Sequence, residues 1–100
     1  MGFTVVLSRI AIRDLAEIVE YIARDNPPAA KRVGHSLVAQ LRRLEEFPRI
    51  GRIVPEFQIE TLREIIQAPY RIVYQINDPA VSIEVARFWH SARGTPEIND

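Results

Sequence analysis

The spacing of hydrophobic residues changes along the chain, and each change predicts a new element. In residues 3–7 the side chains of Phe3, Val5 and Leu7 fall on one side of an extended backbone, which predicts a short β-strand. Apolar residues then recur every three or four positions, the spacing of an amphipathic helix. This stripe consists of Ile12, Leu15, Ile18, Val19 and Ile22. Ser8 stands just before it, where a helix N-cap is expected.

A second helix is predicted after Pro27-Pro28, which interrupts the first one. Asn26 suits the N-cap, and Pro27 suits the first helical position, where a missing N–H group costs nothing. The apolar stripe of this helix is Ala30, Val33, Leu37, Leu41 and Leu44. Pro48 and Gly51 end it. Two helices of similar length with so short a connection predict an antiparallel hairpin.

Beyond the second helix the pattern becomes that of β-strands. A short extended piece is expected at residues 52–54, within a loop. Three longer strands are expected at residues 62–67, 70–76 and 81–89, separated by turn-forming residues. In the last strand Val81, Ile83 and Val85 should face inward, and the alternation breaks at residues 86–88, which predicts a β-bulge.

The predicted fold class is α+β. An N-terminal strand is followed by an antiparallel helix hairpin and then by a three-stranded antiparallel meander, with the helices packed on one face of the sheet. The 100 residues are expected to form a single domain. The opposite sheet face would stay partly uncovered, and we expect function there. The tail after Arg93 is expected to be loose.

Charge changes the functional picture. Thirteen basic residues balance thirteen acidic ones, and Lys31 is the only lysine. A protein that grips a polyanion needs a cationic excess, so no strong direct nucleic-acid binding is expected. Guanidinium groups suit fixed, bidentate contacts better than diffuse screening. The arginine bias therefore indicates placed interactions.

Several sites and compartments are not expected. The chain has no cysteine, which removes disulfides and thiolate sites and makes the cytoplasm the expected compartment. No apolar run is long enough to span a membrane, and the first residues do not form a secretory signal. His35 and His90 are the only histidines, and neither belongs to a metal-binding motif. We expect neither a metal nor a cofactor.

Arginine, aromatic and histidine residues gather in the predicted meander and at its end. The group is Arg63, Tyr70, Arg71, Arg87, Trp89, His90 and Arg93. One interpretation is a metal-free ribonuclease, in which His90 transfers a proton and arginines hold phosphate. The other is structural: the tyrosines are core residues, Trp89 caps the sheet edge, and the arginines are solvated or pair with Glu64 and Glu84. Strand alternation alone favours the structural interpretation.

Several short motifs, in their order and spacing, resemble one known superfamily. They are Asp14-Leu15-Ala16-Glu17-Ile18 with Tyr21-Ile22, then Pro48-Arg49-Ile50-Gly51-Arg52 after Leu44, then Leu62-Arg63-Glu64, Tyr70-Arg71-Ile72-Val73-Tyr74 and Trp89-His90-Ser91-Ala92-Arg93. On these motifs the chain resembles the RelE/ParE superfamily of toxins from type II toxin–antitoxin systems, closest to the ParE-like branch. The resemblance implies a cytoplasmic bacterial toxin, of a kind linked to plasmid stabilisation, that a cognate antitoxin (ParD-like or similar) neutralises.

The two branches imply different activities. RelE-like members cut messenger RNA on the ribosome, whereas ParE-like members poison DNA gyrase. Ribosome-dependent nucleases of the superfamily are rich in lysine and strongly cationic, which this chain is not. Glu64-Ile65-Ile66 carries no cation where the nuclease pattern has one, and the last strand ends in Phe88-Trp89-His90. These departures favour gyrase inhibition, with a ribosome-dependent endoribonuclease or an inactive toxin-like binding protein as alternatives.

The resemblance also implies where partners bind. An antitoxin of this superfamily wraps a segment around the helix hairpin and sheet, and the candidate contacts here are Leu15, Ile18, Tyr21, Ile22, Val38 and Leu41. The ParE-like branch offers no defined catalytic set, so no catalytic residue is assigned. Candidate contacts to the target are Arg63, Arg71, Arg87, Trp89, His90 and Arg93.

Overall fold

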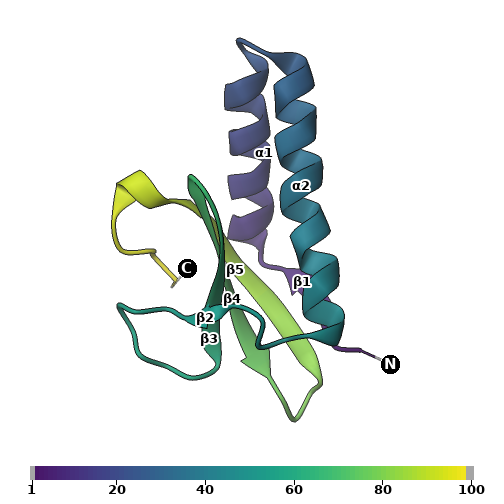
Figure 1. The fold of residues 1–100 in the computed structure, drawn as a ribbon, viewed down its shortest axis with the longest axis vertical. Helices are drawn as coiled ribbons and strands as arrows, with labels where there is room; N and C mark the ends of the chain where they lie inside the picture. Colours follow the sequence, from purple (N-terminus) through teal and green to yellow (C-terminus); the bar gives the residue numbers. More distant parts are fainter. Residues whose placement is uncertain (1, 99–100) are drawn as a thin grey trace.

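Two antiparallel helices stand against one face of a five-stranded sheet and rise well beyond its edge (Figure 1). This arrangement comes from a computed structural model that describes residues 2–98. The elements in chain order are β1 (Thr4–Leu7), α1 (Arg9–Ala23), α2 (Pro27–Glu46), β2 (Arg52–Ile53), β3 (Leu62–Gln67), β4 (Tyr70–Asn77), β5 (Ser82–His90) and a 3-10 turn η1 (Ser91–Arg93). The predicted α+β class and the helix layer on one face of the sheet are confirmed.

Both predicted helix caps are present. The side-chain oxygen of Ser8 accepts a hydrogen bond from the backbone N–H of Ala11 at 3.0 Å. The same hydroxyl donates to the carbonyl of Ala86 at 2.9 Å, which ties the start of α1 to β5. The side-chain oxygen of Asn26 accepts from the N–H of Ala29 at 3.1 Å, with proline at the start of α2. Because these caps satisfy N–H groups that a helix leaves open, they define where each helix begins.

The sheet has the strand order β1-β5-β4-β3-β2. Strands β3, β4 and β5 form the predicted antiparallel meander. In addition, β1 pairs in parallel with β5, with Val5 opposite Ile83, and β2 pairs antiparallel with β3. The meander is therefore the centre of a mixed sheet, extended by one short strand at each side.

The predicted β-bulge lies in β5. Val73 pairs with Arg87, and the next residue, Tyr74, pairs with Val85, so that Ala86 is the extra residue. The start of β5 differs from prediction. Val81 was expected to face inward, but it lies in the turn before β5, has a φ of 49° and is 49% exposed. The prediction for Val81 was wrong because the tight turn, and not the strand, determines its backbone conformation.

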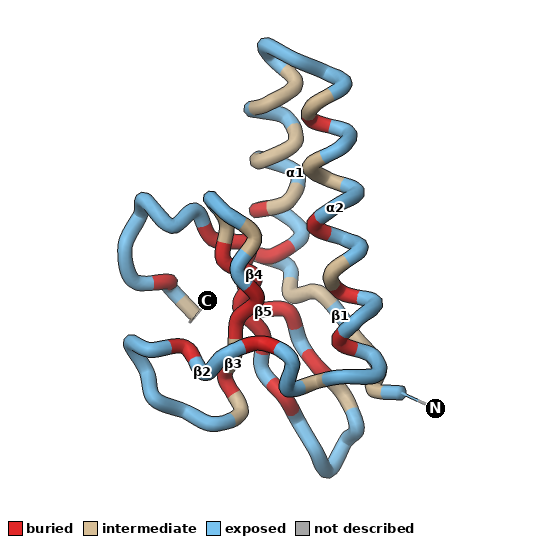
Figure 2. Tube along the Cα trace, viewed as in Figure 1, coloured by how far each residue is buried: buried red, intermediate tan, exposed pale blue. Residues whose placement is uncertain are grey.

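The main core fills the space between the helices and the sheet (Figure 2). Its fully buried members include Leu37, Leu44, Ile72 and Ile83. The predicted helix stripe needs one correction: Ile12, a member of the stripe, is 57% exposed, whereas Asp14, which is not a member, is buried. α1 is thus rotated from the apolar pattern, because Asp14 makes hydrogen bonds to β5.

The face of the sheet away from the helices is partly covered. Val54, Leu62 and Val73 form a second small cluster there, and Ile98 packs against it. Pro96 is also buried. The chain after η1 therefore folds back over the sheet as a strap (Figure 1), here called the C-terminal strap, residues 94–98. The expectation of a loose tail was wrong for this segment, because it buries apolar side chains.

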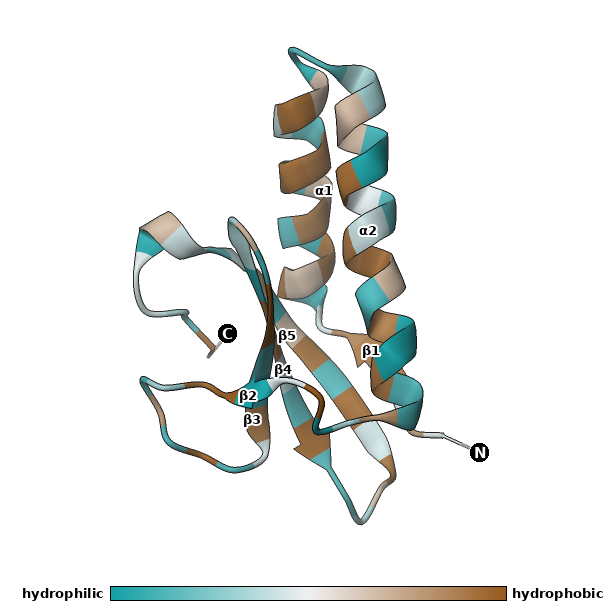
Figure 3. Ribbon diagram, in the orientation of Figure 1, coloured by the Kyte–Doolittle hydropathy of each residue, from teal (hydrophilic) through white to brown (hydrophobic). Residues whose placement is uncertain are grey.

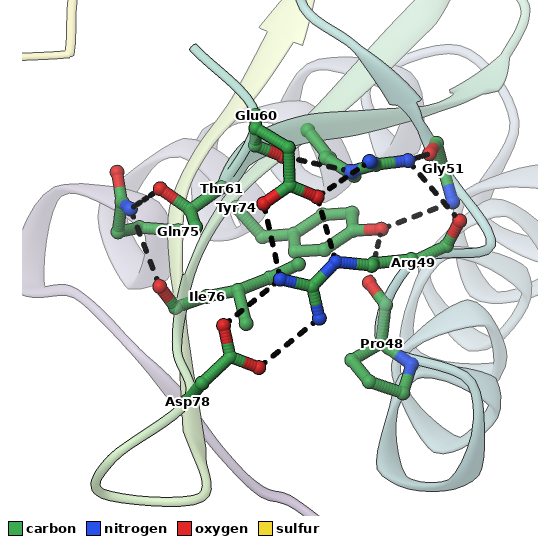
Figure 4. A network of polar contacts seen from close by, with 10 residues as sticks. Pro48, Arg49, Gly51, Glu60, Thr61, Tyr74, Gln75, Ile76 and Asp78 are labelled. Atoms are coloured by element: carbon green, nitrogen blue, oxygen red, sulfur yellow. Dashed lines mark hydrogen bonds and ion pairs between the residues drawn. The ribbon is translucent and has the colours of Figure 1, made fainter.

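A polar network holds the loop after α2 against the strands (Figure 4). Arg49 donates to both carboxylate oxygens of Glu60 and of Asp78, at 2.7–3.1 Å. The hydroxyl of Tyr74 donates to the carbonyl of Pro48 at 2.7 Å and accepts from the N–H of Gly51 at 3.0 Å. These bonds join the end of α2 to β4. Within residues 2–98, no helix has the length and apolar character needed to cross a membrane.

Candidate functional site

Arg71, on β4, is buried between two carboxylates. Its guanidinium donates to Glu64 at 2.6 and 3.1 Å and to Glu56 at 2.9 and 2.7 Å. The hydrogen bonds that Arg71 donates to Glu56 and then to Glu64 raise the pKa of Arg71 above its usual value, and Arg71 in turn lowers the pKa of Glu56 to about 2. The Nε, Nη1 and Nη2 groups of Arg71 therefore all donate to carboxylates within the protein.

Arg87, next to the bulge on β5, is paired in the same way. It donates to the two carboxylate oxygens of Asp14 at 2.7 and 3.0 Å and to the carbonyl of Glu97 at 2.9 Å. Asp14 also accepts the backbone N–H of Phe88 at 3.1 Å. The hydrogen bonds that Arg87 donates to Asp14 raise the pKa of Arg87. This pair joins α1, β5 and the C-terminal strap.

Trp89 lies between two guanidinium groups. The guanidinium carbon Cζ lies 4.8 Å from the centre of the Trp89 ring in Arg87 and 3.9 Å in Arg93. Both distances are within the range of cation–π attraction. The indole N–H donates to the carbonyl of Gly94 at 3.0 Å. Trp89 is buried, so its role as observed is to hold the C-terminal strap against β5. Its predicted contact with a target stays a prediction.

A cleft of about 200 Å³ opens between α1 and the ends of β4 and β5. It is lined by Asp14, Glu17, Ile18, Tyr21, Tyr70, Phe88, His90 and Arg93. The ring of His90 meets that of Tyr70 edge-on, with centroids 5.5 Å apart, and its Nδ1 accepts the N–H of Ala92 at 3.1 Å. Burial raises the pKa of Tyr70. The cleft thus combines the exposed imidazole of His90 with two carboxylates and the guanidinium of Arg93.

The six predicted target contacts do not share one surface. Arg71, Arg87, Trp89 and Arg93 come together under and beside the C-terminal strap, and His90 faces the cleft. Arg63 belongs instead to the network of the loop after α2, where it donates to Glu60 and to the carbonyl of Gly51. The accessible members are His90 and Arg93, which are both exposed.

The predicted antitoxin contacts also separate by burial. Tyr21 is 70% exposed and Val38 is exposed, while Leu15, Ile18 and Ile22 are half-buried. Leu41 is 8% exposed and belongs to the main core, so its contribution is to packing. Of the six, only Leu15 lines the groove of about 610 Å³ along α1, together with Leu7, Ile12, Ala16, Val19 and Glu20. Ile18 and Tyr21 line the cleft between α1 and the sheet instead.

Some residues of these sites were not found from the sequence. Asp14 and Glu56 were not identified as the partners of Arg87 and Arg71, although Glu64 was named as a possible partner for the arginines. A carboxylate on the edge of the helix stripe is the only local signal for Asp14. Among residues 2–98 no three histidine, aspartate or glutamate side chains come together as metal ligands would.

Comparison with known proteins identifies the family. The chain matches, over residues 5–94, the family described as "ParE toxin of type II toxin-antitoxin system, parDE". The chain belongs to this family of toxins. It is similar to Toxin RelE1 of Caulobacter vibrioides, with 36% identity over 90 residues that cover 90% of this chain and 95% of that protein. Toxin RelE2 of the same organism is 37% identical over 84 residues, covering 83% of this chain and 89% of that protein.

Solved structures of ParE and RelE toxins share the fold. A chain of the chromosomal ParDE system from P. aeruginosa superposes with a TM-score of 0.74 at 17% identity, over 89% of this chain and 96% of that one. A mutant of the E. coli toxin RelE in the free state gives 0.68 at 18% identity, over 94% and 88% of the two chains. At these identities the structures show a common fold for this ParE-family toxin. They do not distinguish gyrase inhibition from ribonuclease activity.

Proposed function

We propose that this toxin inhibits DNA gyrase by binding to it through a surface, without cleaving RNA, and that a cognate antitoxin neutralises it. The observation that carries the proposal is the state of Arg71 and Arg87. In the ribonuclease interpretation these side chains hold the phosphate, but each one is buried and paired with carboxylates. A phosphate would have to displace a bidentate carboxylate from a buried guanidinium, which costs several kcal/mol.

The contact surface that we assign to gyrase is the rim of the cleft between α1 and the sheet. His90 and Arg93 are its exposed polar members, and Tyr21 lies across the cleft from them. The buried pairs beneath, Asp14 with Arg87 and Glu64 with Arg71, position this rim by fixing the ends of β4 and β5.

The antitoxin is proposed to cover the groove along α1. Ile12, Leu15 and Val19 give this groove an apolar lining, and an amphipathic segment that buried them would lose little polar hydration. An Ile12→Asp variant should therefore remain toxic and escape neutralisation. A Ser36→Asp variant, on the outer side of α2, is the matched control and should still be neutralised.

RNA cleavage is the second candidate function, and one observation favours it. His90 is exposed and lines the cleft together with Tyr70 and Arg93. Its imidazole can donate a proton, and the guanidinium of Arg93 supplies a cation in the same cleft. Two curated relatives also carry the name RelE. In this case the imidazole would transfer the proton and Arg93 would contact the phosphate.

The test compares the two activities with the same purified proteins. Wild-type toxin in stoichiometric excess over gyrase should block supercoiling of relaxed plasmid and trap cleaved DNA. Arg93→Ala should weaken this effect, and Arg13→Ala, an exposed arginine of α1 outside the cleft, should not. Absence of gyrase inhibition, together with new transcript 5′ ends on induction that disappear in His90→Ala, would contradict the proposal and establish the nuclease.

A further inference from the structure

α2 carries an unusual concentration of positive charge on its outer side. Lys31 and Arg32 lie near its start, and Arg42 and Arg43 follow eleven residues later, which is three helical turns to within about 20°. The four side chains, here called the basic stripe, are all exposed. The buried residues Ala30, Leu37, Leu41 and Leu44 occupy the opposite side of the helix. Figure 3 shows the corresponding hydrophilic colouring along the outer side of α2.

The basic stripe is not neutralised within the protein. Elsewhere in the chain, five arginines form ion pairs with the five carboxylates of Asp14, Glu56, Glu60, Glu64 and Asp78. These arginines are Arg49, Arg52, Arg63, Arg71 and Arg87. Within residues 2–98, no member of the basic stripe forms an ion pair, and Arg43 donates only to the amide oxygen of Gln40, at 2.9 Å. No acidic residue occurs between Pro27 and Leu44. A net charge of zero therefore conceals a segregation of charge, since residues 47–98 contain six basic and six acidic residues, whereas residues 27–44 contain four basic residues and no acidic one.

The surroundings of these cations indicate the class of partner. Ser36 and Ala39 lie between the two pairs, so the stripe is convex and offers no apolar pocket to anchor a peptide. α2 has no phenylalanine, tyrosine or tryptophan, and the exposed imidazole of His35 alone gives no row of rings on which successive bases of a single strand would stack. The major groove of A-form RNA is too narrow for a helix, whereas that of B-DNA admits one.

We propose that the basic stripe of α2 binds the phosphate backbone of duplex DNA without reading its sequence. The two cation pairs are separated by roughly 16 Å along the helix axis, so they contact phosphates on separate parts of the groove rim. This binding is independent of whether gyrase is the target. With at most four phosphate contacts it is weak at physiological salt, in line with the expectation from net charge, and measurable at low salt.

The expected salt dependence of DNA binding follows from counterion release. Four neutralised phosphates correspond to a slope of about −3.6 in a plot of log affinity against log salt, or about a 150-fold loss between 50 and 200 mM salt. Removal of two cations should reduce the slope by about 1.8.

The experiment measures fluorescence anisotropy of a labelled 24-base-pair random duplex with the purified full chain at several salt concentrations. The double variants Lys31→Gln/Arg32→Gln and Arg42→Gln/Arg43→Gln should each lose half of the slope. The matched control, Arg9→Gln/Arg13→Gln on α1, also removes two exposed arginines and should keep it. Circular dichroism confirms that all variants are folded.

Three outcomes would overturn the proposal. The first is no binding of the duplex at 50 mM salt, and the second is an equal loss in the α1 control. The third is tighter binding of single-stranded DNA, duplex RNA or polyglutamate than of duplex DNA, which would assign the basic stripe to another polyanion.

Discussion

Replacement of Asp14 by asparagine should strongly destabilise this toxin. The side chains of Asp14 and Arg87 are only 7% and 9% exposed, and the carboxylate accepts three hydrogen bonds. An asparagine fills the same volume, but its NH₂ group faces the donors of Arg87 and leaves the guanidinium charge buried without a counterion. Removal of one partner of a buried pair costs about 3–5 kcal/mol.

That loss is a large fraction of the stability of a small domain, which is about 5–15 kcal/mol. For a domain of this size each kcal/mol lowers Tm by about 4–8 °C, so Asp14→Asn should lower it by about 12 °C or more. The double variant Asp14→Leu/Arg87→Met should recover part of the loss, because it removes both charges. It leaves two backbone groups without their partners: the buried N–H of Phe88, at about 1–3 kcal/mol, and the carbonyl of the exposed Glu97, which water can solvate.

Urea denaturation followed by far-ultraviolet circular dichroism measures all three free energies of unfolding. Asp25→Asn, an exposed carboxylate at the end of α1, is the control and should change stability by less than about 0.5 kcal/mol. If Asp14→Asn cost less than about 1 kcal/mol, or if the double variant were less stable than the single one, the assignment of this pair as a structural element would be refuted.

Three further predictions concern the loop after α2 and the second buried arginine. Gly51→Ala would place a Cβ atom 2.5 Å from a backbone carbonyl oxygen of β3, so it should cost about 1–3 kcal/mol in urea denaturation, and an unchanged midpoint would contradict this packing. Tyr74→Phe leaves the N–H of Gly51 and the carbonyl of Pro48 without their partner and should cost a similar amount by the same measurement. Because Arg71 holds the pKa of Glu56 at about 2 instead of 4.5, this carboxylate stabilises the fold above pH 4.5, and its contribution is lost as the pH falls from 4.5 to 2. Glu56→Gln should be less stable at neutral pH and show a shallower loss over that window, and parallel pH profiles would argue against the ion pair.

The elements that depend on neighbours in sequence were predictable. Ser8 and Asn26 mark helix starts by their own side chains, and the two-residue alternation of β4 separates Tyr74 from Val73. Even the bulge at Ala86 follows from a local break in alternation. Each of these features is determined within a few residues, where spacing carries the information.

The features that depend on distant contacts were not predictable. An isolated strand such as β1 has no local property that names β5 as its partner, since Val5 and Ile83 are far apart in sequence. The burial of Asp14 and the exposure of Ile12 likewise depend on Arg87, 73 residues away. The sequence offered Glu64 as a possible partner for the arginines, but Asp14 and Glu56, which also pair with Arg87 and Arg71, could not be found from local spacing.

The parallel pairing of β1 with β5 has a consequence for synthesis of the toxin. The first strand cannot acquire its partner until residues 82–85 have left the ribosome, because these are the residues that pair with Thr4–Leu7. At about 5–20 residues per second, several seconds separate translation of the two strands. During that interval the residues of α1 and α2 lack the complete sheet against which they pack. Arg87 has not yet paired with Asp14. The nascent chain therefore exposes the apolar stripes of its helical residues until the last strand has been made.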